Sequence, residues 1–226
     1  ENQQRVVDTV CSDLDVGIHK TYLLRGVTGS GKTEVYMELI AHTVAQGRQA
    51  IVLIPEIALT YQTVMRFYNR FGDRVSIMNS KLSQGERFDQ FERAKAGDID
   101  IMIGPRSALF TPFPHLGLII IDEEHETSYK SETAPRYHAR DVAIERARMN
   151  DASVLLGSAT PSVDSYYQAM QGKYQLLTLS ERVEKKPLPD CEVVDLRSEL
   201  RAGNRSILSE RLQELMEDLS LIHISE

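Results

Sequence analysis

Six short apolar runs, interleaved with stretches of helical periodicity, constrain the fold of this 226-residue chain more than any other feature. The runs are continuously apolar, as in "QAIVLI", rather than alternating between apolar and polar residues. Strands of that kind are buried on both faces, and their alternation with helices predicts an α/β fold with a mostly parallel sheet and helices on both faces. The expected strands are 21–26, 49–54, 74–78, 99–104, 116–122 and 152–157, and the expected helices are 32–46, 57–71, 83–96, 138–149 and 162–171.

The regular pattern extends to about residue 180 and then weakens. Residues 182–206 are polar and interrupted by prolines, which is typical of a linker. Residues 207–219 resume the pattern of an amphipathic helix, with Ser209 as the candidate N-cap. We therefore expect a domain over residues 1–180 and a peripheral or linker segment over residues 181–226, which leads toward another domain.

The composition excludes several classes of protein. Apolar residues make up 42% of the chain, and no apolar run approaches the roughly 18–20 residues that span a bilayer. The N-terminus lacks a secretory pattern, and Cys11 and Cys191 lie far apart, so we expect a cytoplasmic protein without a membrane partner, a disulfide scaffold or a zinc site. Because the net charge is −7, any nucleic-acid site must be a local patch.

The segment "GVTGSGKT" matches G-x-x-x-x-G-K-[ST] between an expected strand and an expected helix. Its glycines allow the backbone to turn N–H groups toward a phosphate, and the positive end of the following helix adds to the attraction. Lys32 would reach the β- and γ-phosphates of ATP, and Thr33 would ligate Mg²⁺. An ordinary glycine-rich turn is the alternative, which the full match disfavours. The expected ATP-binding residues are Gly26, Val27, Thr28, Gly29, Ser30, Gly31, Lys32 and Thr33.

A second polar element, "DEEHE", follows the apolar run "LGLIII". Asp122 lies at the carboxyl end of this expected strand, where open α/β sheets bind their ligands. Asp122 would bind Mg²⁺, directly or through water, and Glu123 would be the general base for an attacking water, so both join Lys32 as candidate catalytic residues. An acidic pair after a strand is common by chance, but beside a phosphate loop it indicates a nucleoside triphosphatase.

The pattern D-E-x-H, completed by His125, resembles that of superfamily 2 helicases. "GSATPS" (157–162) is similar to the S-A-T element of these enzymes. The resemblance implies a RecA-like P-loop NTPase lobe, in which His125, Ser158 and Thr160 couple the nucleotide state to the grip on DNA. Taken alone, the histidine is more often structural, and S-A-T is merely a capped turn.

Three further positions fit the same superfamily. "LIPEIALTYQ" (53–62) and "GPRSALF" (104–110) end two expected strands, where superfamily 2 helicases contact the nucleic-acid backbone. Arg106 and Ser107 have suitable donors for phosphate oxygens. Gln3, ahead of the first expected strand, is similar to the glutamine that reads adenine in related helicases.

Several ordered motifs resemble one helicase family in particular, the bacterial replication-restart helicases of the primosomal protein N′ (PriA) type. They are "GVTGSGKTEVY", "PEIALT", "RSALFTPF", "IDEEHETSYK" and "PRYHARDVA", and the resemblance runs from about Gln3 to about Thr178. The segment "ETSYKSETAPRYHARD" (126–141) corresponds to an aromatic-rich loop that couples single-stranded DNA to ATP hydrolysis in that family. Tyr129 and Tyr137 would stack on bases, while Lys130 and Arg136, with Arg140, would contact phosphates. A solvated surface loop is the alternative.

The resemblance also implies partners and missing parts. It implies binding to single-stranded or forked DNA, movement in the 3′-to-5′ direction, and contacts with other primosome and single-strand-binding proteins. The whole family protein also has an N-terminal DNA-binding domain, a second motor lobe with an arginine finger and a zinc insertion. The motifs of this segment cover none of these parts, and its two cysteines cannot supply the zinc ligands, so we expect the first motor lobe only. Because translocation needs two lobes that close on one nucleotide, we expect no unwinding activity from this lobe by itself.

Two other functions stay open from the sequence. One is a P-loop phosphotransferase that acts on a small molecule, which would leave the S-A-T and aromatic segments without a role. The other is a module that binds nucleotide and single-stranded DNA without turnover.

Overall fold

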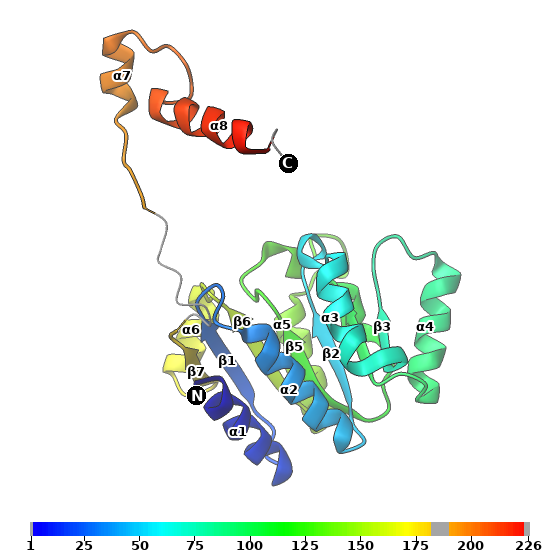
Figure 1. Ribbon diagram of the computed structural model, residues 1–226. Coiled ribbons are helices and arrows are strands. Elements are labelled where there is room, and N and C mark those ends of the chain that lie inside the picture. The colour runs from blue at the N-terminus through cyan, green and yellow to red at the C-terminus, as the bar shows by residue number, and fades with distance from the viewer. Residues whose placement is uncertain (1, 182–189, 224–226) are drawn as a thin grey trace. The chain divides into compact units, whose positions relative to one another are not determined.

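The computed structural model describes residues 2–181 and 190–223 of the chain (Figure 1). Backbone contacts divide the chain into two compact units, Glu1–Lys185 and Lys186–Glu226. Among the described residues, the first unit contains a β-sheet with its helices and the second contains two helices. None of the helices in this described part of the chain is long and apolar enough to cross a membrane.

The sheet has seven described strands, and every neighbouring pair runs parallel. Every residue of β2, β4, β5 and β6 is buried, which confirms the parallel sheet expected from continuously apolar runs. In their spatial order the strands are β3 (Val75–Ile77), β4 (Ile101–Gly104), β2 (Gln49–Leu53), β5 (Leu116–Ile121), β6 (Ser153–Ser158), β1 (Thr21–Gly26) and β7 (Gln175–Leu179).

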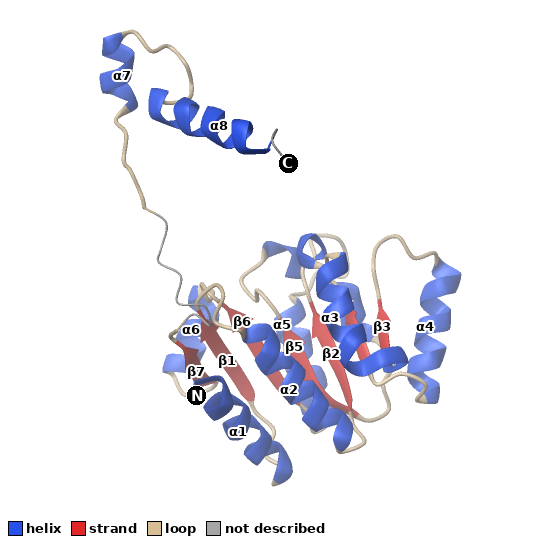
Figure 2. Ribbon diagram, viewed as in Figure 1, coloured by secondary structure: helices blue, strands red, loops and turns tan. Residues whose placement is uncertain are grey.

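Helices cover both faces of the sheet (Figure 2). Successive residues of a strand point to opposite faces, so Ile120 of β5 belongs to one core and Ile121 to the other. The first core lies beneath α1 (Asn2–Asp15), α2 (Lys32–Ala45) and α3 (Tyr61–Phe71), which stand in front of the sheet in Figure 1. The second core contains residues of α4 (Gln84–Ala96) and α5 (Ala139–Met149), and α6 (Val163–Met170) packs against it through Ala169.

The carboxyl edge of the sheet carries nearly all the polar motifs. The phosphate loop follows β1, Asp122 follows β5 and the S-A-T element ends β6. Short 3₁₀ turns at Glu56–Ala58 and Arg106–Phe110 follow β2 and β4, and another at Thr127–Tyr129 lies beyond Asp122; a fourth, Gly72–Arg74, precedes β3. Because parallel strands end together, residues distant in sequence converge at this edge, which is where such sheets bind ligands.

In the first unit, the structure differs most clearly from the expected elements in three places. Helix α1 was not expected, and it buries only Val6, Val10 and Leu14, four residues apart, against the core. Strand β7 was also not expected, because burial alternates along this edge strand instead of being continuous. The expected helix 57–71 begins only at Tyr61, since the Thr60 side chain accepts a hydrogen bond from the backbone of Thr63 (3.3 Å) and caps it.

The second unit contains α7 (Leu196–Ala202) and α8 (Glu210–His223). Glu199 connects the two helices, because its Oε2 accepts hydrogen bonds from the side chain of Asn204 (2.8 Å) and from the backbone of Glu210 (3.1 Å). The Ser209 hydroxyl accepts from the backbone N–H of Leu212 (3.1 Å), so the expected amphipathic helix has the expected cap. Helix α7 was not expected. Among the residues of α8 whose burial is described, 210–220, the exposed apolar ones are Leu212, Leu215, Met216 and Leu219.

Candidate functional site

The backbone of the phosphate loop has the conformation that its glycines allow. Gly29 and Gly31 have φ angles of 78° and 80°, in the left-handed region that other residues avoid. At Gly26, a Cβ atom would lie 2.6 Å from the Ser30 Oγ and 3.0 Å from the Lys32 Cγ. The tight turn is closed by a hydrogen bond from the backbone of Ser30 to that of Val27 (3.0 Å). The loop therefore forms a narrow cradle that any larger residue at position 26 would fill.

Two polar groups of this cradle fit a bound phosphate. The Lys32 Nζ donates to the backbone carbonyl of Gly26 (3.0 Å) and lies 3.7 Å from the Glu123 Oε1. The Ser30 Oγ is buried and has no hydrogen-bond partner among the described residues. A buried hydroxyl without a partner is costly, and a phosphate oxygen bound in the loop would accept the missing hydrogen bond. Thr33, in the first turn of α2, is half-buried, and Val27 and Thr28 are exposed.

Gln3 comes to this loop from α1. Its side-chain nitrogen donates to the backbone carbonyls of Ser30 (3.0 Å) and Gly31 (3.3 Å). The residue is half-buried beside the phosphate loop, so it lies next to the expected nucleotide. Its role in reading adenine stays a prediction.

Asp122 is held by tyrosine hydroxyls from two different elements. The Tyr36 hydroxyl of α2 donates to the Asp122 Oδ1 (2.8 Å), and the Tyr129 hydroxyl donates to the Asp122 backbone carbonyl (2.7 Å). Gly157 makes room for Tyr36, since a Cβ atom there would lie 1.8 Å from the Tyr36 hydroxyl. Burial raises the pKa of the Asp122 carboxyl, although the hydrogen bond from Tyr36 and the charge of Lys32 act in the opposite direction. A cation would favour the charged form of this carboxylate.

Glu123 has the backbone conformation of a strained residue. Its φ angle of 46° lies in the left-handed region, which is uncommon for a residue with a side chain. Such a conformation costs about 1–3 kcal/mol and persists only where the surroundings impose it. The side chain is 32% exposed, so water can reach it, and its oxygens lie 3.7 Å from both the Lys32 Nζ and the His125 Nδ1.

The structure brings the D-E-x-H and S-A-T elements into contact. The His125 Nδ1 and the Ser158 Oγ form a hydrogen bond of 2.8 Å, and the Ser158 Oγ also accepts from the backbone N–H of Thr160 (3.0 Å). Ser158 is buried, whereas Thr160 is exposed. The two elements are therefore joined by a hydrogen bond, although their role in coupling stays a prediction.

Glu124 is a residue whose position the sequence did not reveal. It is 1% exposed, and its carboxylate accepts hydrogen bonds from the backbone N–H (2.6 Å) and hydroxyl (3.1 Å) of Ser162 and from the hydroxyl of Ser165 (2.8 Å). The Arg140 Nη1 lies 3.7 Å from this carboxylate and also donates to Ser162 and Ser165. The interpretation of Arg140 as a phosphate contact is wrong, because its side chain is only 13% exposed and already paired.

The structure also corrects the interpretation of Tyr129 as a stacking face. Its side chain is buried, with 1% exposure, and its hydroxyl donates to the backbone carbonyls of Leu53 (3.1 Å) and Asp122. No base can reach this ring in the conformation described. Tyr129 instead anchors the aromatic loop to the carboxyl ends of β2 and β5.

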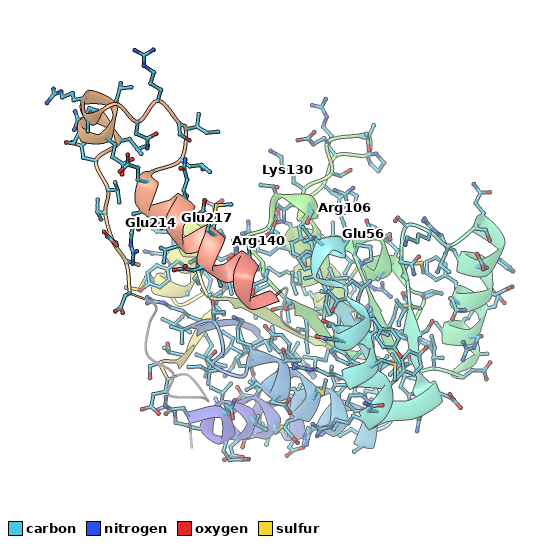
Figure 3. The ribbon with its side chains drawn as sticks, turned by 45° about the horizontal axis from the view of Figure 1, so that its top comes forward. Glu56, Arg106, Lys130, Arg140, Glu214 and Glu217 are labelled. Atoms are coloured by element: carbon cyan, nitrogen blue, oxygen red, sulfur yellow. The ribbon has the colours of Figure 1, made fainter. Side chains whose placement is uncertain are left out.

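The other expected DNA-binding residues lie together. The Arg106 guanidinium lies 5.5 Å from the centre of the half-buried Tyr137 ring, and it donates to the backbone carbonyls of Ser128 (3.2 Å) and Lys130. Figure 3 shows Arg106, Lys130 and Glu56 on neighbouring segments. Tyr137 lies between two hollows of the surface. One is lined by residues that include Glu56, Arg87, Arg106 and Ser107, and the other is lined by Lys130, Ser131, Glu132, Arg136, Tyr137 and His138.

Solved structures agree with this fold. A RecG structure bound to a three-way DNA junction superposes with a TM-score of 0.61 at 24% identity, covering 82% of this chain and 24% of that chain. The Hef helicase domain of Pyrococcus furiosus superposes with a TM-score of 0.54 at 17% identity, covering 80% of this chain and 38% of that chain. At these identities the likeness establishes the fold alone.

Sequence relatives are more similar. The replication restart protein PriA of Bacillus subtilis is 49% identical over 218 residues, and that of Synechocystis is 47% identical over 208 residues. The alignments cover 96% and 90% of this chain but only 27% and 25% of the relatives, so the chain spans about a quarter of their length. The expected resemblance to that type of helicase is thereby confirmed. The family model for DEAD/DEAH box helicases matches residues 1–169, and the chain belongs to this family.

Proposed function

We propose that this chain is the ATP-binding motor lobe of an ATP-dependent DNA helicase that acts in replication restart. Membership of the DEAD/DEAH box family implies the use of ATP and Mg²⁺. The observation that carries the proposal is the convergence of Lys32, Asp122 and Glu123 at one end of the sheet. His125, two residues after Glu123, forms a hydrogen bond with Ser158 of the S-A-T element. A sensor of nucleotide state thus adjoins the groups that would bind and hydrolyse the nucleotide.

The residues of the cradle divide the work of binding and hydrolysis. Lys32 would exchange the carbonyl of Gly26 for the β- and γ-phosphates, and the Ser30 hydroxyl would gain a partner. Mg²⁺, held by Thr33 and Asp122, would neutralise charge on the phosphates. Glu123 would accept a proton from the attacking water as the bond between the β- and γ-phosphates breaks. The Glu123 Oε1 lies 3.7 Å from the Lys32 Nζ, so the proposed base already neighbours the cation that would bind the phosphates.

The proposed DNA site is the surface around Tyr137. Arg106, Lys130 and Arg136 supply positive charge next to this aromatic ring, the combination that binds single strands without reading their sequence. Single-stranded or forked DNA is therefore the proposed partner, with 3′-to-5′ movement in the whole protein. By similarity to PriA we also propose contacts with other primosome and single-strand-binding proteins, a zinc site outside this segment, and action in the cytoplasm, where bacterial DNA lies.

The substitution Glu123→Gln in the full-length protein tests this proposal. Glutamine keeps the shape of the side chain but cannot accept the proton, so we expect kcat for ATP hydrolysis to fall by about 10²- to 10⁴-fold with little change in MgATP affinity. Phosphate release is measured with and without an oligothymidylate, and binding is measured by calorimetric titration. Glu92→Gln, at an exposed position of α4, is the matched control.

Three results would contradict the proposal. Wild-type turnover in the Glu123→Gln protein would remove the role of the base. A wild-type protein that binds nucleotide and DNA without turnover would be a binding module. Transfer of phosphate to a small acceptor, without stimulation by DNA, would indicate a phosphotransferase.

A further inference from the structure

The segment Glu126–His138, here called the aromatic loop, and the helix turn that follows it contact Asp122 and Glu124, the residues on either side of Glu123. On the side where the loop begins, the Tyr129 hydroxyl donates to the Asp122 carbonyl (2.7 Å), which belongs to the peptide bond between Asp122 and Glu123. On the side where the loop ends, Arg140 lies in the first turn of α5, and its Nη1 lies 3.7 Å from the Glu124 carboxylate. The residue proposed as the base thus lies between two attachments of one loop.

The attachment through Glu124 is buried and fully paired. The Glu124 side chain has no exposed surface, and its two oxygens accept three hydrogen bonds from Ser162 and Ser165 at the start of α6. Arg140 donates to both of these serine hydroxyls, at 3.2 Å and 2.8 Å. A buried carboxylate is stable only with such partners, so its place is fixed by α5 and α6 together. The backbone of Glu124 also donates to the Gly157 carbonyl (3.0 Å), one residue before Ser158.

The strained backbone of Glu123 makes these attachments consequential. A residue with a φ angle of 46° keeps that conformation only while its neighbours impose it. Releasing Glu124 would let Glu123 relax toward an ordinary conformation and move its carboxylate. Where positioning determines a rate, a displacement of about 1 Å can lower that rate roughly 100-fold.

We infer that Arg140 is a positioning residue for Glu123, which acts through Glu124 and the start of α6. The inference rests on the proposed function of Glu123 as the base and extends it to residues without access to the nucleotide. Because Arg140 lies two residues beyond the aromatic loop, a movement of that loop would change the geometry of hydrolysis by the same route.

The test is Arg140→Met in the full-length protein, with Arg148→Met as the matched control. Arg148 lies on the same helix, is largely exposed and pairs only with Glu145 among the described residues. We expect Arg140→Met to lower kcat for ATP hydrolysis roughly 10- to 100-fold, with and without an oligothymidylate, while KM for ATP and the Kd for DNA change little. Arg148→Met leaves all four quantities unchanged.

A double variant, Glu124→Gln with Arg140→Met, separates positioning from folding. Arg140→Met alone leaves the buried Glu124 carboxylate without its cation, so we expect its melting temperature to fall. The double variant removes both charges, so we expect its melting temperature to return toward the wild-type value while kcat stays low. A wild-type kcat in Arg140→Met, or recovery of kcat together with stability in the double variant, would overturn the inference. If DNA does not stimulate ATP hydrolysis by the wild-type protein, the proposed function is contradicted instead. The role of Arg140 is still tested in that case, by comparing the rates of hydrolysis without DNA.

Discussion

At the scale of single residues, Asp122 shows how a residue of a ligand site can lower the stability of the folded protein. Burial raises the pKa of this carboxyl above its usual value of 3.8. Folding therefore favours the protonated form of Asp122. Its contribution to stability is largest below pH 3.8 and is lost as the pH rises through the raised pKa. At neutral pH the nucleotide-free protein keeps a carboxylate that its surroundings disfavour.

Asp122→Asn should therefore stabilise the nucleotide-free protein at pH 7. Asparagine can still accept the hydrogen bond from Tyr36 but carries no charge. A pKa shift of one unit corresponds to about 1.4 kcal/mol, and about 1 kcal/mol moves the melting temperature of a domain of this size by about 2–4 °C, so the gain is measurable by calorimetry.

The gain should disappear when melting is repeated below pH 3.8, where the wild-type carboxyl is also neutral. Asp89→Asn, at an exposed position of α4, is the control and should leave the melting temperature unchanged at both pH values. MgATP affinity should fall in Asp122→Asn alone. An equal or lower melting temperature of Asp122→Asn at pH 7 would show that burial does not burden this carboxylate.

At the scale of elements, the aromatic loop contains two tyrosines with opposite roles. Tyr129 is buried and donates to two backbone carbonyls, whereas Tyr137 is half-buried, with the Phe110 ring centroid 5.6 Å away and Arg106 over its ring. In the sequence both are aromatic residues of one polar loop. What distinguishes Tyr129 is its contact with the carbonyls of Leu53 and Asp122. The sequence does not reveal these contacts, because they depend on how the loop folds back onto the ends of β2 and β5.

Two substitutions should separate these roles. Tyr129→Phe removes the single hydroxyl donor shared by the two carbonyls but keeps the packed ring, so we expect a loss of stability of about 0.5–1.5 kcal/mol and an unchanged Kd for single-stranded DNA. Tyr137→Ala removes the accessible ring, so we expect DNA binding to weaken by about 1–3 kcal/mol. Chemical denaturation measures the first quantity, and fluorescence anisotropy with a labelled oligothymidylate measures the second.

An unchanged stability of Tyr129→Phe would contradict the anchoring role of the Tyr129 hydroxyl, and an unchanged Kd of Tyr137→Ala would contradict the stacking role of the Tyr137 ring. Tyr166→Ala, on the exposed side of α6, controls for the loss of an aromatic ring elsewhere.

The same elements explain what the sequence could predict. Strands β2, β4, β5 and β6 are buried on both faces, so composition alone identifies them. Strand β7 was missed because an edge strand can expose half of its residues. The phosphate loop was predictable because its geometry is local, set by glycines at positive φ. The Glu124 cluster was not, since it depends on how α5 and α6 pack beside β6.

At the scale of the whole molecule, the proposed function requires an acidic protein to bind DNA, which is a polyanion. The chain has 26 basic and 33 acidic residues, so its overall field does not attract DNA. Binding must depend on local groups such as Lys130 and Arg136, which line the hollow beside Tyr137. Contacts of that kind release counterions from the DNA, which makes affinity depend on salt.

Replacing Lys130 and Arg136 together with Ala should therefore weaken DNA binding and reduce its dependence on salt. Each phosphate contact with a single strand contributes about 0.7 to the slope of log K against log salt concentration, so losing two should make the slope less steep by about 1.4. Anisotropy titrations of the full-length protein with a labelled oligothymidylate, over a range of salt concentrations, give both slopes.

The control changes the net charge by the same amount at the opposite edge of the sheet. Lys95 and Arg148 are exposed and lie in the last turns of α4 and α5, which precede β4 and β6 and so end near the amino ends of the strands. Replacing both with Ala should leave the salt slope unchanged, because distant charges are screened within about 10 Å at 0.1 M salt. If the two double variants lose affinity equally, net charge rather than the surface around Tyr137 governs DNA binding, and the proposed DNA site is wrong.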